Sequence, residues 1–140
     1  MSAVTKGYVT FRIGDRVYAT ALDEVREIVR LSGLTPLPGM AQPMAGVVEL
    51  RGVPLPVMDL RAEGADSAGG DVVVLADESG TAIGVAVDAV VAVRPTEHLV
   101  GTGEATAGLP AYVVEVLRDS AAGGPVLRVD IRRMLDLATV

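Results

Sequence analysis

Residues 46–61, GVVELRGVPLPVMDLR, form the stretch that decides the fold. Apolar residues alternate along it as they do in a β-strand, yet Arg51-Gly52 interrupts the run near its middle. Glycine accepts backbone angles that other residues resist, so this dipeptide predicts a turn or bulge between two strands. Val48 and Leu50 would then lie on one face of the first strand, and residues of the other parity on the opposite face.

The second strand of this stretch contains Pro54 and Pro56, which lack backbone N–H groups. Residues i and i+2 of an antiparallel strand direct their amides toward the same neighbour, so both donors are lost on one side only. We therefore expect an edge strand that is protected against further pairing. Arg51 would project from its end, where the guanidinium could reach a carboxylate or carbonyl. The alternative is an ion pair with Glu49 or Asp59 inside the fold, which would add little to stability.

Further strands are predicted along the rest of the chain. A hairpin is expected from residues 8–13 and 16–19 across a Gly14-Asp15 turn, because both segments alternate with a period of two. The other predicted strands cover residues 71–76, 81–87, 90–93, 111–117 and 126–129. Short strands at this spacing, joined by glycine-rich turns, are typical of barrels or sandwiches.

Two short helices are predicted between the strands. Thr20 with Asp23 three residues later resembles a helix N-terminus, and it precedes apolar residues at helical spacing: Leu22, Val25 and Val29. Near the C-terminus, Asp130 can cap a helix with one apolar face, formed by Ile131, Met134 and Leu135. The small, polar segment 61–70 is expected to be a loop, too short to separate independent domains.

The composition limits the classes of function. The chain has 140 residues, no cysteine and a net charge of −6. These values argue against nucleic acid, whose phosphates are bound largely by Lys and Arg, and they exclude disulfide and thiol chemistry. No apolar run approaches the ~20 residues that span a bilayer, and the first residues do not look like a signal peptide. We expect one cytoplasmic domain over residues 1–140.

Catalytic side chains are scarce. His98 is the only histidine, it is expected in a solvated loop, and no Gly-x-Ser-x-Gly turn is present to expose a nucleophilic serine. The Gly-Thr-Gly segment at 101–103 lacks the strand-to-helix setting of a phosphate-binding loop. We therefore expect no catalytic residue, no metal site and no cofactor.

Several motifs occur together in one order along the chain. GVVELRG at 46–52 is followed by PVMDLR at 56–61, and both are flanked by FRIGD at 11–15, VREI at 25–28, LTPLP at 34–38 and IGVAVDAV at 83–90. In this order and spacing, the segments resemble the signature of the CheW family, the chemotaxis coupling proteins. The resemblance covers nearly the whole chain.

The resemblance implies an all-β fold of two interwoven five-stranded SH3-like barrels with short helices, including a C-terminal one. It also implies a non-enzymatic adaptor that joins a methyl-accepting chemoreceptor tip to the regulatory domain of a CheA-type histidine kinase in membrane-attached arrays. The matching motifs imply that Arg51, Val25 and Glu27 bind partners. A looser alignment with the family adds Val72 and Val93. Plain core packing is the alternative for the three valines, and a solvated helix position for Glu27.

The sequence also departs from the family pattern. Glu49 stands where asparagine is common, Pro54 stiffens the following strand, and segment 61–70 lacks the apolar residues often found there. These departures leave open an accessory coupling protein of another pathway, such as gliding or development. A β-barrel module for unrelated peptides or small ligands, and an enzyme built around His98, are the remaining alternatives.

Overall fold

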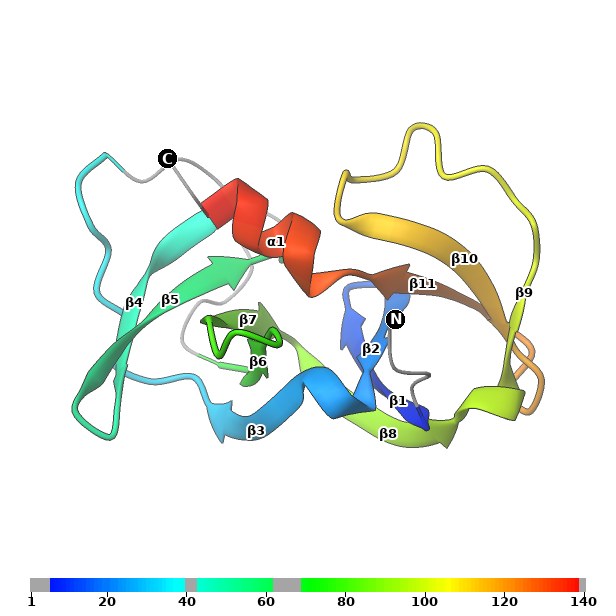
Figure 1. The fold of residues 1–140 in the computed structure, drawn as a ribbon, viewed down its shortest axis with the longest axis horizontal. Coiled ribbons are helices and arrows are strands. Elements are labelled where there is room, and N and C mark those ends of the chain that lie inside the picture. Colours follow the sequence, from blue (N-terminus) through cyan, green and yellow to red (C-terminus); the bar gives the residue numbers. More distant parts are fainter. Residues whose placement is uncertain (1–5, 40–42, 62–68, 139–140) are drawn as a thin grey trace.

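The computed structural model describes residues 6–39, 43–61 and 69–138, whose strands form two sheets (Figure 1). The strands, in chain order, are β1 (Gly7–Ile13), β2 (Arg16–Ala21), β3 (Val25–Arg30), β4 (Met44–Leu50), β5 (Val53–Asp59), β6 (Asp71–Ala76), β7 (Ala82–Val87), β8 (Ala89–Pro95), β9 (Leu99–Gly101), β10 (Val113–Asp119) and β11 (Pro125–Val129). An α-helix, α1 (Ile131–Ala138), follows β11, and two 3₁₀ turns, η1 (Leu22–Glu24) and η2 (Thr96–His98), precede β3 and β9.

The chain shares its strands between the two sheets in an interwoven order. The first sheet has the order β8-β1-β2-β11-β10-β9 and the second β3-β6-β7-β5-β4. The chain thus begins the first sheet, builds the whole of the second, and returns to complete the first. The predicted all-β fold of two interwoven units with a short C-terminal helix is confirmed, with the short strand β9 as a sixth member of the first sheet.

The predicted hairpins are confirmed. β1 pairs with β2 from Tyr8 opposite Ala21 to Ile13 opposite Arg16, and Gly14 in the turn has a φ of 59°. β6 pairs with β7 along its whole length. β10 and β11 form the last antiparallel pair, and β11 joins the sheet by pairing in parallel with β2.

The two sheets share one buried core. Its largest cluster takes side chains from β1 and β2 of the first sheet and from β5, β6 and β7 of the second. Phe11 is fully buried, and its ring stacks on that of Tyr18 with 5.8 Å between centroids. Ile131 and Met134 of α1 complete the cluster. Because both sheets bury apolar surface in the same cluster, each stabilises the other.

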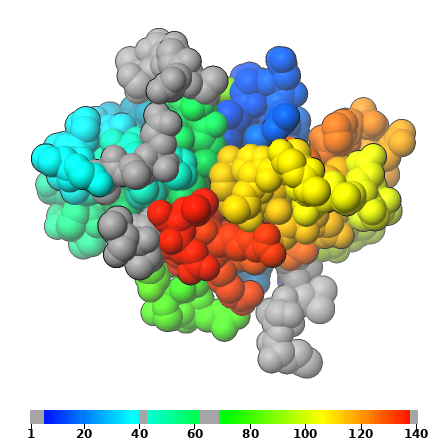
Figure 2. All heavy atoms as spheres, turned by 90° about the horizontal axis from the view of Figure 1, so that it is seen from above, coloured from blue at the N-terminus to red at the C-terminus, as the bar shows by residue number. Residues whose placement is uncertain are grey.

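The C-terminal helix begins as predicted. Asp130 Oδ1 accepts the Arg132 N–H at 2.9 Å, which satisfies one free donor of the first turn. Figure 2 shows the segment before β10 (yellow) lying against α1 (red), and Arg133 donates to the Ala111 carbonyl oxygen at 3.0 Å. Within the described ranges, no helix has the length and apolar character that crossing a membrane requires.

The predicted helix over residues 22–29 is wrong beyond its first turn. Leu22–Glu24 form only η1, after which Val25–Arg30 form β3 and pair with β6. Thr20 does not cap η1, because it lies fully buried in β2 and the N-terminal position is Ala21. Val25 and Val29, four residues apart, fit both a helical and a strand repeat, and pairing with β6 supplies the backbone partners that decide between them.

The predicted edge strand is also wrong as stated, because β5 lies between β4 and β7 while β4 is the outer strand. The parallel pairing with β7 covers only Val57 to Asp59. Pro54 and Pro56 pair with β4 alone, opposite Glu49 and Val47. The prolines therefore sit in a half of β5 that has a neighbour on one side only, which is where missing donors are tolerated.

Most of the predicted loop at 61–70, namely residues 62–68, lies outside the described residues. Its two described ends are joined, since Arg61 Nη1 donates to the Gly69 carbonyl oxygen at 2.6 Å. The Gly70 carbonyl oxygen then accepts the N–H of Leu31 at 3.1 Å, just beyond β3. These bonds join the end of β5 to the start of β6 and attach both to the segment that follows β3.

Candidate functional site: a strained hairpin tip beside the outer strands

The β4–β5 hairpin has the shortest kind of connection. Leu50 pairs with Val53, so only Arg51 and Gly52 form the loop. Their φ angles are 50° and 80°, as a two-residue turn of type I′ requires. Arg51 is the one residue other than glycine with a positive φ in the described part of the chain. Backbone strain of this kind tends to persist where a side chain is needed in a fixed place.

The side chain of Arg51 forms a two-pronged ion pair with Glu27 of β3. Nη1 donates to Oε1 at 3.1 Å, and Nη2 donates to Oε2. The two predicted partner-binding residues, 24 positions apart in the chain, are thus brought together. The Arg51 side chain keeps 73% of its surface exposed, against 25% for Glu27, so the guanidinium remains available from outside.

The ion pair changes the acid–base properties of both groups. The hydrogen bond from Arg51, reinforced by its charge, lowers the pKa of Glu27, and the same bond raises the pKa of Arg51. Both groups therefore stay charged across the physiological pH range. The alternative partners do not engage Arg51: Asp59 is bound to Arg61, and Glu49 is exposed on the outer face of β4.

The three predicted valines lie in different environments. Val93 on β8 is 61% exposed, whereas Val25 at the start of β3 is half-buried against the core. Val72 on β6 is fully buried and packs within the second sheet, in agreement with the core-packing alternative. Val93 and Val25 can reach a partner at the surface, but Val72 can act only through the residues that pack on it.

Two exposed apolar residues on the outer strands β3 and β8 were not predicted from the sequence. Ile28 on β3 is 44% exposed and Val91 on β8 is 52% exposed. β3 and β8 are outer strands, one in each sheet, and both run along the same long side of the molecule (Figure 1). Ile28 was not identified because its segment was expected to be a helix, and its exposed position follows only from the alternation of a strand. Val91 carries the same signal as Val93, two residues further along β8.

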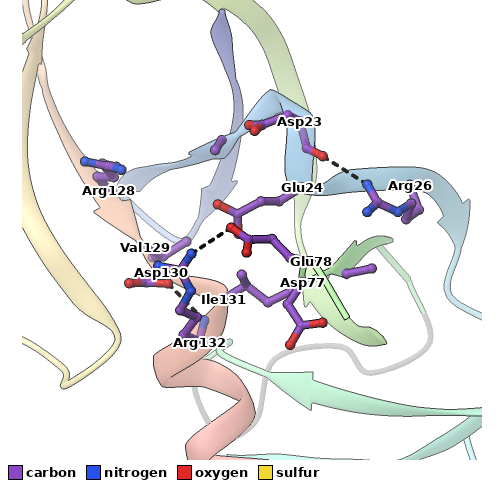
Figure 3. A pocket seen from close by; sticks show the side chains of 12 residues that line it. Asp23, Glu24, Arg26, Asp77, Glu78, Arg128, Val129, Asp130, Ile131 and Arg132 are labelled. Atoms are coloured by element: carbon purple, nitrogen blue, oxygen red, sulfur yellow. Dashed lines mark hydrogen bonds and ion pairs between the residues drawn. The ribbon is translucent and has the colours of Figure 1, made fainter. Parts of the chain in front are cut away.

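A charged pocket lies where the two sheets meet, at η1, the β6–β7 turn and the start of α1 (Figure 3). Arg132 pairs with Glu78 at 3.2 Å across this pocket. Burial raises the pKa of Glu24, and the neighbouring Asp130 and Asp23 raise it further. Among the residues that the structure describes, no group of three or more His, Asp or Glu side chains is arranged to hold a metal ion.

His98 is not in an open loop but in η2, and it is half-buried. Its Nδ1 is buried without a hydrogen-bond partner, while its carbonyl oxygen accepts the Ser120 N–H at 2.8 Å. The Gly101-Thr102 segment closes β9 onto β10, where the Thr102 hydroxyl donates to the Val116 carbonyl oxygen at 2.9 Å. Both segments hold the first sheet together.

Two interwoven sheets on one core, with exposed apolar outer strands, define an all-β protein of the paired SH3-like barrel architecture. The solved crystal structure of the scaffolding protein TtCheW from Thermoanaerobacter tengcongensis has the same fold, with a TM-score of 0.74 over 91% of this chain and 90% of that one, at 22% identity. The family model of the CheW-like domain matches residues 7–138, and the chain belongs to that family.

Two curated relatives are similar in sequence. The probable chemotaxis protein CheW of Rhizobium etli is 32% identical over 133 residues, which cover 92% of this chain and 81% of the relative. The chemotaxis protein CheW of Rhizobium meliloti is 33% identical over 86 residues, which cover 59% of this chain and 56% of the relative.

Proposed function

We propose that this protein is a chemotaxis-type signalling adaptor that binds the regulatory domain of a CheA-type histidine kinase and the cytoplasmic tip of a chemoreceptor. It works in the cytoplasm, recruited to membrane-attached receptor arrays, and performs no bond chemistry. The observation that carries the proposal is the Arg51–Glu27 pair, because it joins the two family motifs at one exposed place. Membership of the CheW-like domain family supports it.

The outer strands supply a surface for the receptor. Ile28, Val91 and Val93 give β3 and β8 exposed apolar side chains, and Arg26 and Arg30 on β3 are exposed at their rim. A chemoreceptor tip is a helical hairpin, and helices are commonly held by apolar grooves with a few charges at the edge. β-Branched side chains lose little rotamer freedom on binding, which favours valine and isoleucine there.

The hairpin tip supplies a contact for the kinase domain. Arg51 presents a guanidinium whose orientation is fixed by Glu27, and such a group recognises a carboxylate or carbonyl with defined geometry. Val53 beside it is 64% exposed and offers an apolar contact. Glu49, where the family commonly has asparagine, adds a negative charge on β4 that would bias the choice of partner.

Binding measurements with separate partners test this function. The purified protein is titrated with a CheA-type regulatory domain and, separately, with a receptor cytoplasmic fragment from the same genome. We expect binding to each at micromolar protein, and weaker kinase binding for Arg51→Ala with an unchanged circular dichroism spectrum. Failure to bind either partner at that concentration rejects the adaptor function. Unfolding of Arg51→Ala would instead assign Arg51 a structural role.

A further inference from the structure

Two interactions in the second sheet link strands that are not neighbours in its order. β3 and β4 stand at opposite ends of that order. The segment after β3 nevertheless reaches β4, because Thr35 and Val47 exchange two backbone hydrogen bonds of 2.9 Å each. The second link is the ion pair of Glu27 with Arg51. Both links join the β3 side of the sheet to the β4–β5 hairpin.

Gly46 lies directly beside the first link. A Cβ atom there would stand 2.4 Å from the Thr35 carbonyl oxygen and 2.8 Å from its carbonyl carbon, closer than real Cβ atoms come. The φ of Gly46 is 153°, a value that L side chains rarely adopt. It also sits at the irregular point where the pairing of β4 with β5 shifts register. Glycine is required here both by its backbone angle and by the close approach of a second backbone.

The hairpin beyond Gly46 depends on these links for its placement. β5 pairs with β7 only from Val57 onward, so the hairpin between Leu50 and Pro56 is hydrogen-bonded to itself alone within the sheet. Val48 and Leu55 pack into the core beneath it, but apolar packing does not fix direction as hydrogen bonds do. A two-pronged guanidinium–carboxylate contact needs both oxygen atoms in line, so a small swing of the tip weakens it.

We propose that Gly46 is a positioning residue for the docking site. By letting the Thr35 backbone touch β4, it holds the hairpin where Arg51 meets Glu27. Any side chain at this position would push Thr35 away and separate the ion pair, although position 46 itself contacts neither charged group. The importance of this effect for partner binding rests on the proposed function, whereas the effect on the ion pair can be measured in the isolated chain.

The test compares Gly46→Ala with a matched control, Gly123→Ala. Gly123 also has a positive φ, of 82°, but nothing lies within 4 Å of a Cβ built there, so it carries the backbone cost without the close contact. The readout is the pKa of the Glu27 carboxyl, followed by NMR in the isolated protein and assigned with Glu27→Gln. Arg51→Ala gives the value for a broken pair.

We expect Gly46→Ala to raise the Glu27 pKa to the value of Arg51→Ala, because Arg51 lowers it in the intact pair. Gly123→Ala should leave it unchanged. A folded Gly46→Ala protein with an unchanged Glu27 pKa overturns the inference. Should Gly46→Ala fail to fold, Thr35→Pro removes the donor to the Val47 carbonyl without adding an atom at position 46, and the same rise is expected.

Binding measurements then separate this inference from the proposed function. Affinity for the kinase regulatory domain should fall equally in Gly46→Ala and Arg51→Ala, and the double variant should lose no more than either single one. If the Glu27 pKa rises while neither variant loses affinity, the positioning role stands and the docking role of Arg51 is rejected. If the losses of binding free energy in Gly46→Ala and Arg51→Ala add fully in the double variant, Gly46 does not act through the Arg51–Glu27 pair, and the inference is overturned.

Discussion

Asp59 and Arg61, two residues apart at the end of β5, are joined by three hydrogen bonds of 2.9 Å each. Asp59 Oδ1 accepts the Arg61 backbone N–H and Nε–H, and Oδ2 accepts Nη2–H. The Arg61 side chain is only 3% exposed. Its Nη1 reaches the Gly69 carbonyl oxygen, so one buried guanidinium closes the base of the segment between β5 and β6. This pairing leaves Glu27 as the partner of Arg51.

Replacing Arg61 should therefore destabilise the fold. Arg61→Met keeps much of the apolar stem and the backbone N–H bond to Asp59, but it removes the guanidinium donors to Asp59 and to the Gly69 carbonyl oxygen. Hydrogen bonds to charged groups contribute about 1.5–3 kcal/mol each, and the partial exposure of Asp59 places the expected loss in the free energy of unfolding at roughly 2 kcal/mol. Urea denaturation would measure it. A loss within experimental error would show that water replaces these bonds.

Substitutions at position 51 should separate backbone strain from side-chain function. Arg51→Gly and Arg51→Ala both remove the ion pair with Glu27, but only glycine relieves the positive φ. We expect Arg51→Gly to melt at a higher temperature than Arg51→Ala, while both lose kinase-domain affinity to the same extent. Equal melting temperatures would mean that the turn does not keep its left-handed angle in solution.

The outer strands should tolerate substitutions that weaken receptor binding. Val93 and Ile28 are exposed outside the core, so Val93→Asp and Ile28→Asp should fold with nearly unchanged stability. We expect each to weaken binding of a receptor fragment by roughly tenfold or more, the equivalent of about 1.4 kcal/mol. Val72→Asp is the contrasting variant, because it places a charge in the core and should not fold. Wild-type affinity in both outer-strand variants would exclude β3 and β8 as the receptor surface.

The shared core should make the two sheets unfold together. Phe11 is fully buried in the cluster to which both sheets contribute, and truncation of such a residue to alanine typically costs about 3–5 kcal/mol. Amide signals from β6 and from β10 should disappear at the same urea concentration in the wild-type protein and at the same lower concentration in Phe11→Ala. Two separate transitions would show that each sheet has its own stability.

The pocket at the junction of the sheets should make stability depend on pH. Burial and the nearby Asp130 raise the pKa of Glu24 above its ordinary value of 4.5, so the folded state binds its proton more tightly than the unfolded state. The stability contributed by this proton is present below pH 4.5 and is lost as pH rises through the folded-state pKa.

Glu24→Gln should therefore melt at a higher temperature than the wild type at pH 7. The difference should shrink as pH falls toward 4. Thermal melts across this range would measure it, with Glu78→Gln as an exposed control from the same pocket. Parallel pH profiles for Glu24→Gln and the wild type would show that Glu24 is not perturbed by its surroundings.

The strands and turns were predictable because local rules fix them. Gly14 at one turn and Arg51-Gly52 at another mark hairpins whatever their surroundings, and Asp130 caps α1 by contacts within one turn. The family resemblance supplied Arg51 and Glu27, but it did not indicate that they touch. Their contact depends on how the hairpin lies relative to β3, a property of the whole sheet.

The failure at residues 22–29 has a specific cause. In β3 the half-buried face carries Glu27 between Val25 and Val29, and the exposed face carries Ile28 between two arginines. An acid on the inner face and an apolar residue on the outer one disrupt the alternation that would have identified a strand. Glu27 forms the ion pair with Arg51, and Ile28 belongs to the exposed apolar surface. Local sequence rules therefore fail where the proposed binding site lies.

The parallel pairing of β2 with β11 also affects how the protein is made. The ribosome releases the β1–β2 hairpin early, but its neighbours β8 and β11 begin only at residues 89 and 125. The β1 edge of that hairpin has unpaired backbone groups until β8 is made, and the β2 edge until β11 is made. Closing such distant contacts costs chain entropy before it gains stability, so folding should be slower than for a helical protein of equal length. A nascent chain in this state is one that general chaperones would recognise.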